Sequence, residues 1–138
     1  MTERTDQLSP DEMVLRRIPN AEFKPATKEV KFGAFVPTKK DVTGISFQQL
    51  SKMSPGEMVD RATGKGPYLV VQFSVGELRD MGLNPVITDS DGHVEIPELS
   101  FSERANDPDK IDEILIQLAT KASEDGRIAL GLTMPRRS

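Results

Sequence analysis

The sequence lacks cysteine and tryptophan, and it contains one histidine, His93, in 138 residues. Without cysteine, the chain cannot form a disulfide, bind a metal through thiolates or use a thiol as a nucleophile. A zinc site of Cys and His ligands is therefore excluded, and any catalysis by an imidazole must use His93. From this composition we expect neither a bound metal nor a cofactor.

Long apolar runs are also missing from the sequence. No stretch approaches the ~18 consecutive apolar residues that a membrane-spanning helix needs. The first seven residues are polar and include Glu3 and Asp6, unlike the basic start and apolar stretch of a secretory signal. Together with the lack of cysteine, these features predict a cytoplasmic protein with no membrane partner.

The charge balance argues against a nucleic-acid partner. The net charge is −4, with acidic residues in clear excess in the second half of the chain and basic residues slightly in excess in the first. Tyr68 is the one tyrosine, and no basic cluster is interleaved with aromatic side chains. We therefore expect no nucleic-acid binding.

Length and composition predict a single domain. Hydrophobic residues make up 36% of the chain and charged residues 29%, as in an ordinary globular domain. We predict a disordered lead-in over residues 1–8, one domain over residues 9–133 and a basic tail over residues 134–138.

Helix starts are indicated by a repeated capping pattern, in which a serine is followed three residues later by a glutamate. It occurs at Ser9-Pro10-Asp11-Glu12, Ser54-Pro55-Gly56-Glu57 and Ser74-Val75-Gly76-Glu77. It predicts short helices over residues 10–17, 55–62 and 75–81, the last ending at Gly82. A longer amphipathic helix is predicted after Asp107, with apolar residues at steps of three and four from Ile111 to Ala122.

Strands are predicted where β-branched and aromatic residues cluster. The candidates are residues 30–36, 44–47, 68–73, 86–88, 93–96 and 128–132, and the two strands around Asp89-Ser90-Asp91-Gly92 should form a hairpin. Residues 68–73 read as a strand buried on both faces. Loops are expected over residues 19–28, 37–43 and 97–106. Helices and strands do not alternate regularly, so we predict an α+β fold with a small mixed or antiparallel sheet.

Two segments match ligand-binding loops only in part. The segment from Asp89 to Glu98 resembles a calcium loop in part, but Ile87 stands where the first carboxylate is needed and Pro97 where the exit helix should begin. A solvated hairpin is the preferred interpretation. The segment 63–66, Thr-Gly-Lys-Gly, lacks the first glycine and the final Ser or Thr of a phosphate-binding loop.

His93 is the candidate general base. Glu95 follows two residues later, on the same face of a strand, where its carboxylate can orient the imidazole. The alternative is a surface histidine in an acidic turn. Arg16 and Arg17 are candidates for anion binding, because a guanidinium matches a carboxylate or phosphate. Placed on the predicted helix 10–17, at most one of them would line a site.

The chain resembles a family of small uncharacterised bacterial proteins over about residues 13–96. Its members open with a leucine-x-arginine-isoleucine segment, then serine-x-alanine-phenylalanine and a leucine-serine-valine strand. The matching segments here are Leu15-Arg16-Arg17-Ile18, Phe32-Gly33-Ala34-Phe35, Gly44-Ile45-Ser46-Phe47, Leu69-Val70-Val71, Ser74-Val75-Gly76-Glu77-Leu78, Gly82 and His93-Val94-Glu95-Ile96. Gly33 replaces the small polar residue of the pattern. The family carries a histidine at a comparable place and has no established activity, so the resemblance implies an organisation and no mechanism.

Two functions of different classes follow. The preferred one is a non-catalytic protein-interaction module of a bacterial or phage-encoded system, which binds a protein partner or a second copy of itself. The alternative is a small enzyme, such as an NAD-using or nucleotide-using transferase, with Arg17, Ser46, His93 and Glu95 in its site. Their order (arginine, strand serine, distal glutamate) is similar to that of enzymes that transfer ADP-ribose from NAD. A concave site that unites His93 with Arg17 or Ser46 would favour the enzyme, and an exposed apolar patch would favour the module.

Overall fold

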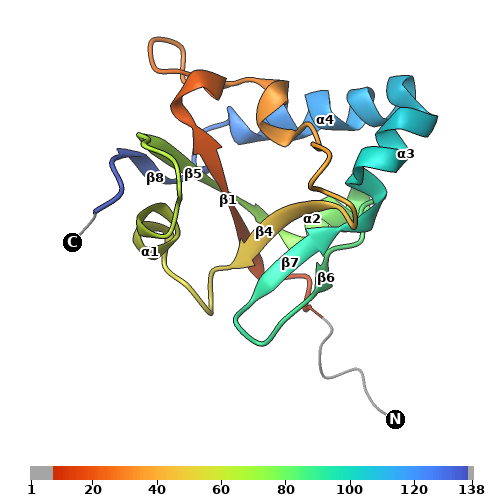
Figure 1. The fold of residues 1–138 in the computed structure, drawn as a ribbon, viewed down its shortest axis with the longest axis horizontal. Helices are drawn as coiled ribbons and strands as arrows, with labels where there is room; N and C mark the ends of the chain where they lie inside the picture. Colours follow the sequence, from red (N-terminus) through yellow and green to blue (C-terminus); the bar gives the residue numbers. More distant parts are fainter. Residues whose placement is uncertain (1–7, 137–138) are drawn as a thin grey trace.

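An antiparallel sheet organises the chain, and the fold is α+β as predicted (Figure 1). The structure is a computed structural model that describes residues 8–136. Over that range the main sheet has six strands in the order β6-β7-β4-β1-β5-β8. They are β1 (Met13–Pro19), β4 (Ile45–Gln49), β5 (Tyr68–Ser74), β6 (Val86–Ile87), β7 (His93–Ile96) and β8 (Ile128–Thr133). The strands β2 (Phe23–Lys24) and β3 (Glu29–Val30) form a separate pair.

Helices connect and cover these strands. They are α1 (Pro55–Asp60), α2 (Val75–Asp80), α3 (Phe101–Asn106) and α4 (Pro108–Ala122), with 3-10 turns η2 (Asn20–Glu22), η3 (Phe32–Phe35) and η4 (Pro97–Leu99). The predicted helices 55–62 and 75–81 correspond to α1 and α2, and the predicted hairpin is β6–β7. In the part of the chain that the structure describes, no helix has the length and apolar character to span a bilayer.

The first strand corrects the helix predicted over residues 10–17. Ser9 and Glu12 form a single turn, in which the Glu12 amide donates to the Ser9 carbonyl over 3.1 Å. The chain then enters β1, which pairs with β4 on one side and β5 on the other. Consecutive residues Val14 and Leu15 are both fully buried, on opposite faces of the sheet. Pairing within the sheet outweighs the local capping signal because a strand with two neighbours can bury both side chains.

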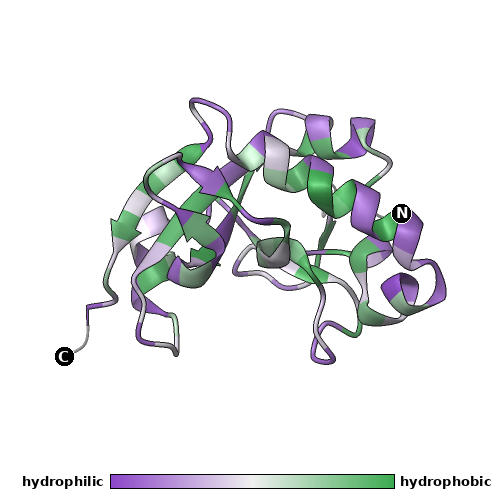
Figure 2. Cartoon of the chain, turned by 90° about the horizontal axis from the view of Figure 1, so that it is seen from above, coloured by the Kyte–Doolittle hydropathy of each residue, from purple (hydrophilic) through white to green (hydrophobic). Residues whose placement is uncertain are grey.

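Two hydrophobic cores lie on the two faces of the sheet. The larger one packs α4 against the sheet and includes Phe35, Phe47 and Phe73, whose rings meet edge to face at 6.0 and 6.1 Å between centroids. The smaller one packs Met58 and Val59 of α1 onto the opposite face. The long helix has the predicted cap at Asp107, and hydrophobic and hydrophilic stretches alternate along its ribbon in Figure 2.

Two further segments differ from prediction. Residues 30–36 form only the end of β3 and the turn η3, because Ala34 and Phe35 both pack into the larger core, whereas a strand would direct them to opposite faces. Residues 97–106 form η4 and α3 in place of a loop. The sequence contains the capping pattern at Ser100-Phe101-Ser102-Glu103, and in the structure the Ser100 side chain accepts a hydrogen bond from the Glu103 amide.

The predicted lead-in and the predicted basic tail lie at the two ends of the chain. The lead-in predicted over residues 1–8 lies outside the described residues except for Leu8, which is buried. Of the predicted basic tail, residues 134–136 are described, and Arg136 pairs with Asp60 at 2.8 Å.

Gly44 allows close contact between the start of β4 and the end of β7. Its φ is +124°, and a Cβ atom added there would overlap the carbonyl group of Ile96. We expect Gly44→Ala to lower the free energy of unfolding by about 3 kcal/mol. Gly131→Ala is the control, because it has open space around it and should change stability by less than about 0.5 kcal/mol. Urea denaturation of both variants tests this expectation, and equal stabilities would contradict it.

Glu77 ties α2 to the start of β8. Its carboxylate accepts from the Ser74 amide and from both terminal nitrogens of Arg127, one at 2.6 Å. Burial raises the pKa of Glu77, but the hydrogen bonds from Arg127 and Ser74, with the charges of Arg127 and Lys121, outweigh it and hold the pKa below the usual value.

The lowered pKa makes the contribution of Glu77 dependent on pH. Its stabilisation is present above the ordinary glutamate pKa and is lost as the pH falls through the lowered value, where the folded state also takes up the proton. We expect Glu77→Gln to cost about 2 kcal/mol at pH 7 and progressively less toward pH 3. Urea denaturation at several pH values measures this, with the more exposed Glu57→Gln as control. A cost that does not change with pH would refute the assignment.

Candidate functional site

The site begins where the pairing of β1 with β4 ends. The last pair is Leu15–Gln48, and beyond it the Arg16 side chain connects the two strands. Its Nη1 donates to the Ser46 carbonyl at 2.8 Å, and its Nε and Nη2 donate to the Ala34 carbonyl at 2.9 and 2.8 Å. The guanidinium also lies over the rings of Phe35 and Phe47, at 5.6 and 5.7 Å. Arg16 thus joins β1, β4 and η3.

This arrangement partly buries the Arg16 side chain. Burial lowers the pKa of its guanidinium to about 10, with Asp41 acting in the opposite direction and Arg17 adding to the decrease. Among residues 8–136, no carboxylate lies within ion-pair distance of Arg16. Its direct hydrogen-bond partners are main-chain carbonyls, which satisfy the donors but do not neutralise the charge.

Arg17 extends on the opposite face of the sheet, toward α1. Its Nη1 donates to the Met58 carbonyl at 2.7 Å, and its guanidinium carbon lies 5.7 Å from the centre of the Tyr68 ring. Burial lowers the pKa of Arg17, and Tyr68 opposes this effect. In the described part of the chain, Arg17 too has no carboxylate within ion-pair distance.

Both arginines line one open pocket of about 690 Å³. Its walls come from β1, β4, β5 and β7, from the β6–β7 turn, from α1 and the segments on either side of it, and from η2, η3 and the following loop. The lining residues used below are Arg16, Arg17, Glu22, Asp41, Ser46, Tyr68, Asp89, Asp91 and His93. The prediction that at most one of the arginines lines a site was wrong. It assumed a helix, whereas here the pocket opens where β1 and β4 stop pairing and so reaches side chains from both faces.

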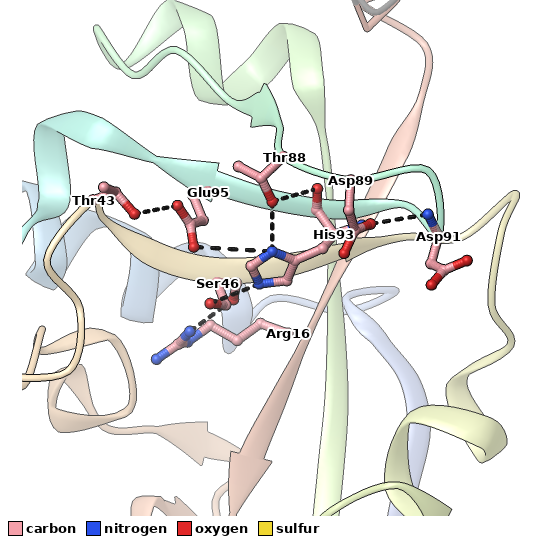
Figure 3. Close-up of polar contacts among 8 residues, drawn as sticks. All are labelled: Arg16, Thr43, Ser46, Thr88, Asp89, Asp91, His93 and Glu95. Carbon is pink, nitrogen blue, oxygen red and sulfur yellow. Dashed lines mark hydrogen bonds and ion pairs between the residues drawn. The ribbon is translucent and has the colours of Figure 1, made fainter.

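His93 lies in this pocket at the centre of a polar cluster (Figure 3). Its Nε2 is 3.0 Å from the Ser46 hydroxyl on the neighbouring strand, and its Nδ1 is 2.6 Å from the Thr88 hydroxyl. A Glu95 oxygen lies 3.9 Å from Nδ1, and the other carboxylate oxygen of Glu95 accepts from the Thr43 hydroxyl. The arrangement places a hydroxyl, an imidazole and a carboxylate in series.

The acidic turn before His93 is locally organised. Asp89 accepts from the amides of Asp91 and His93 at 2.9 and 3.0 Å. The His93 amide contributes most to a lowered pKa of Asp89, burial opposes it, and the Asp91 amide adds to the decrease. No group of three or more His, Asp or Glu side chains within residues 8–136 is arranged to hold a metal ion.

The residues predicted from the sequence come together to a large extent. Arg17, Ser46 and His93 line the same pocket, and Glu95 lies beside His93 without being part of the lining. Sequence reasoning missed the role of Thr88. The hairpin register contained that information, because the pairs Val86–Glu95 and Ile87–Val94 place Thr88 opposite His93.

Comparison with known proteins adds no functional information. No protein-family model matches the chain, and no match to a curated protein or a solved structure was found. The resemblance to a family of small bacterial proteins therefore stays a prediction.

We expect Arg16 to be a structural requirement of the site. Arg16→Met keeps an unbranched apolar stem, removes the guanidinium and leaves the carbonyls of Ala34 and Ser46 without their donors. We expect the free energy of unfolding to fall by about 2 kcal/mol. Arg61→Met, which removes an exposed pair with Glu57, should change it by less than about 0.5 kcal/mol. Chemical denaturation measures both, and a wild-type stability for Arg16→Met would rule out this role.

Proposed function

We propose that the protein binds a small anionic ligand in this pocket and that Arg17 recognises the anion. The observation that carries the proposal is the half-buried guanidinium of Arg17, which lines the pocket and meets a carbonyl and an aromatic ring but no carboxylate in the described chain. Removing a charge from water is costly unless an opposite charge compensates it. A bound carboxylate or phosphate would supply that charge, and a guanidinium fork matches either group.

The acidic residues of the pocket narrow the class of ligand. Glu22 and Asp41 come from the segments around η2 and the loop after η3, and Asp89 and Asp91 come from the β6–β7 turn. Asp41 accepts from the Thr38 amide, and Asp89 accepts from the turn amides. Because these carboxylates would repel further negative charge, the site suits a ligand with one anionic group and several hydroxyl or amino donors.

The volume of the pocket and its aromatic side chain also favour a small ligand of this class. A pocket of about 690 Å³ accommodates a small metabolite, since such sites commonly measure about 300–1,000 Å³. The Tyr68 ring adds a flat surface beside Arg17. A nucleoside monophosphate has these properties, which connects the pocket to the nucleotide-using enzyme predicted as the alternative function.

Isothermal titration of the purified chain with inorganic phosphate, AMP and NAD tests the proposal. We expect at least one of them to bind and Arg17→Gln to weaken that binding by about 2 kcal/mol, or about 30-fold, as for a hydrogen bond to a charged group. Arg104→Gln is the matched control, because Arg104 pairs with Asp112 away from the pocket.

Two results would count against the proposal. One is no binding of any of these anions at millimolar concentration. The other is equal affinity for Arg17→Gln and the wild type.

The protein-interaction module preferred from the sequence stays a second candidate, and one observation supports it. A groove of about 580 Å³ between η3 and α4 contains two exposed apolar side chains, Phe32 (40% exposed) and Ile116 (54% exposed). Such a groove suits an apolar side chain of a protein partner or of a second copy. The cytoplasmic location likewise stays a prediction.

A further inference from the structure

We propose that Ser46 and His93 are a nucleophile and a general base that hydrolyse an ester bound in this pocket. The inference rests on the proposed function for one feature only, the anionic group of the substrate that Arg17 would hold. It adds a reaction, which the binding of an anion does not require.

Two tautomers of His93 fit the contacts of its ring, and the proposed reaction uses the one with the proton on Nδ1. The Thr88 hydroxyl has one hydrogen, which it can donate to the His93 carbonyl at 3.2 Å or to Nδ1 at 2.6 Å. When the carbonyl receives it, the hydroxyl oxygen accepts from Nδ1, and that nitrogen carries the proton. Nε2 then keeps a lone pair, which faces the Ser46 hydroxyl at 3.0 Å. This is the tautomer that a base needs to remove the serine proton.

The surroundings favour transfer of that proton. When Nε2 takes it up, the imidazole becomes positive, and the Glu95 carboxylate 3.9 Å from Nδ1 stabilises the new charge. Thr43 fixes Glu95 through its other oxygen. Glu95 and Thr88 act through the ring and are positioning residues, whereas Ser46 and His93 touch the substrate.

A substrate can reach Ser46 and His93 through the pocket. Ser46 is half-buried, the His93 side chain is 35% exposed, and both line the opening. Arg16, hydrogen-bonded to the carbonyl of the same serine, supplies positive charge beside the reacting centre. The Ser46–His93 hydrogen bond therefore lies at the surface of a pocket that a substrate can enter, with two arginine side chains in the same lining.

The reaction balances without a metal or redox partner. Ser46 Oγ attacks the ester carbonyl carbon while its proton moves to His93 Nε2. The bond from carbon to the alkoxy oxygen breaks, and the leaving alcohol takes the proton from His93. Water then attacks the acyl-serine, giving its proton to His93. The bond to Ser46 Oγ breaks, Ser46 regains that proton, and a carboxylic acid is released.

The test uses diethyl 4-nitrophenyl phosphate, an uncharged reagent that phosphorylates activated serines and releases 4-nitrophenol. The purified full chain is incubated with it, the released nitrophenolate is followed by absorbance, and the modified residue is located by mass spectrometry. We expect one adduct, on Ser46, and none in Ser46→Ala. His93→Gln should slow the reaction by about 100-fold or more, the usual contribution of a general base. Ser51→Ala is the matched control, because Ser51 bonds to Glu12 and does not line the pocket.

A second variant, Thr88→Val, keeps the test decisive even if His93→Gln fails to fold. Thr88→Val removes the acceptor that keeps the proton on Nδ1, and it should slow labelling while circular dichroism stays that of the wild type. No adduct on Ser46, or wild-type labelling rates in His93→Gln and Thr88→Val, would overturn the proposal. Because the reagent is uncharged, phosphate binding without labelling would refute only the reaction, and labelling without anion binding would refute only the proposed ligand.

Discussion

The site depends on how Arg16 is buried. At the point where β1 and β4 no longer exchange main-chain hydrogen bonds, one guanidinium bonds to Ser46 in β4 and to Ala34 in η3. The strands therefore separate without losing their connection, and the space between them becomes the pocket. Burying a guanidinium that has carbonyls but no carboxylate as direct partners in the described chain is costly, and the hydrogen bonds that Arg16 makes to β4 and η3 offset part of that cost.

The sheet brings the remaining groups together through its register. Ser46 faces Glu95 across β4 and β7, and Gln48 faces His93, so all four side chains share the α1 face of the sheet. Arg17 reaches the same face from β1. Residues separated by up to 78 positions in the chain thus meet because three adjacent strands are antiparallel and aligned.

Much of the fold was predictable from local signals, and the failures have a common cause. The caps at Ser54, Ser74 and Asp107 predicted three helices correctly, because each cap bonds to an amide within its own first turn. The same signal at Ser9 was misleading, since β1 gains two neighbouring strands that no local pattern reveals. The four candidate residues Arg17, Ser46, His93 and Glu95 were identified by chemical type, but their mutual distances depend on strand order, which the sequence alone did not provide.

Tyr68 has a consequence for how this protein can be observed. It is the one tyrosine of a chain without tryptophan, and its ring lies against Arg17 in the wall of the pocket. The ultraviolet emission of the protein therefore originates almost entirely from one side chain at the proposed binding site. Whatever enters the pocket changes the surroundings of that single fluorophore, so the protein contains its own optical reporter of occupancy and needs no label.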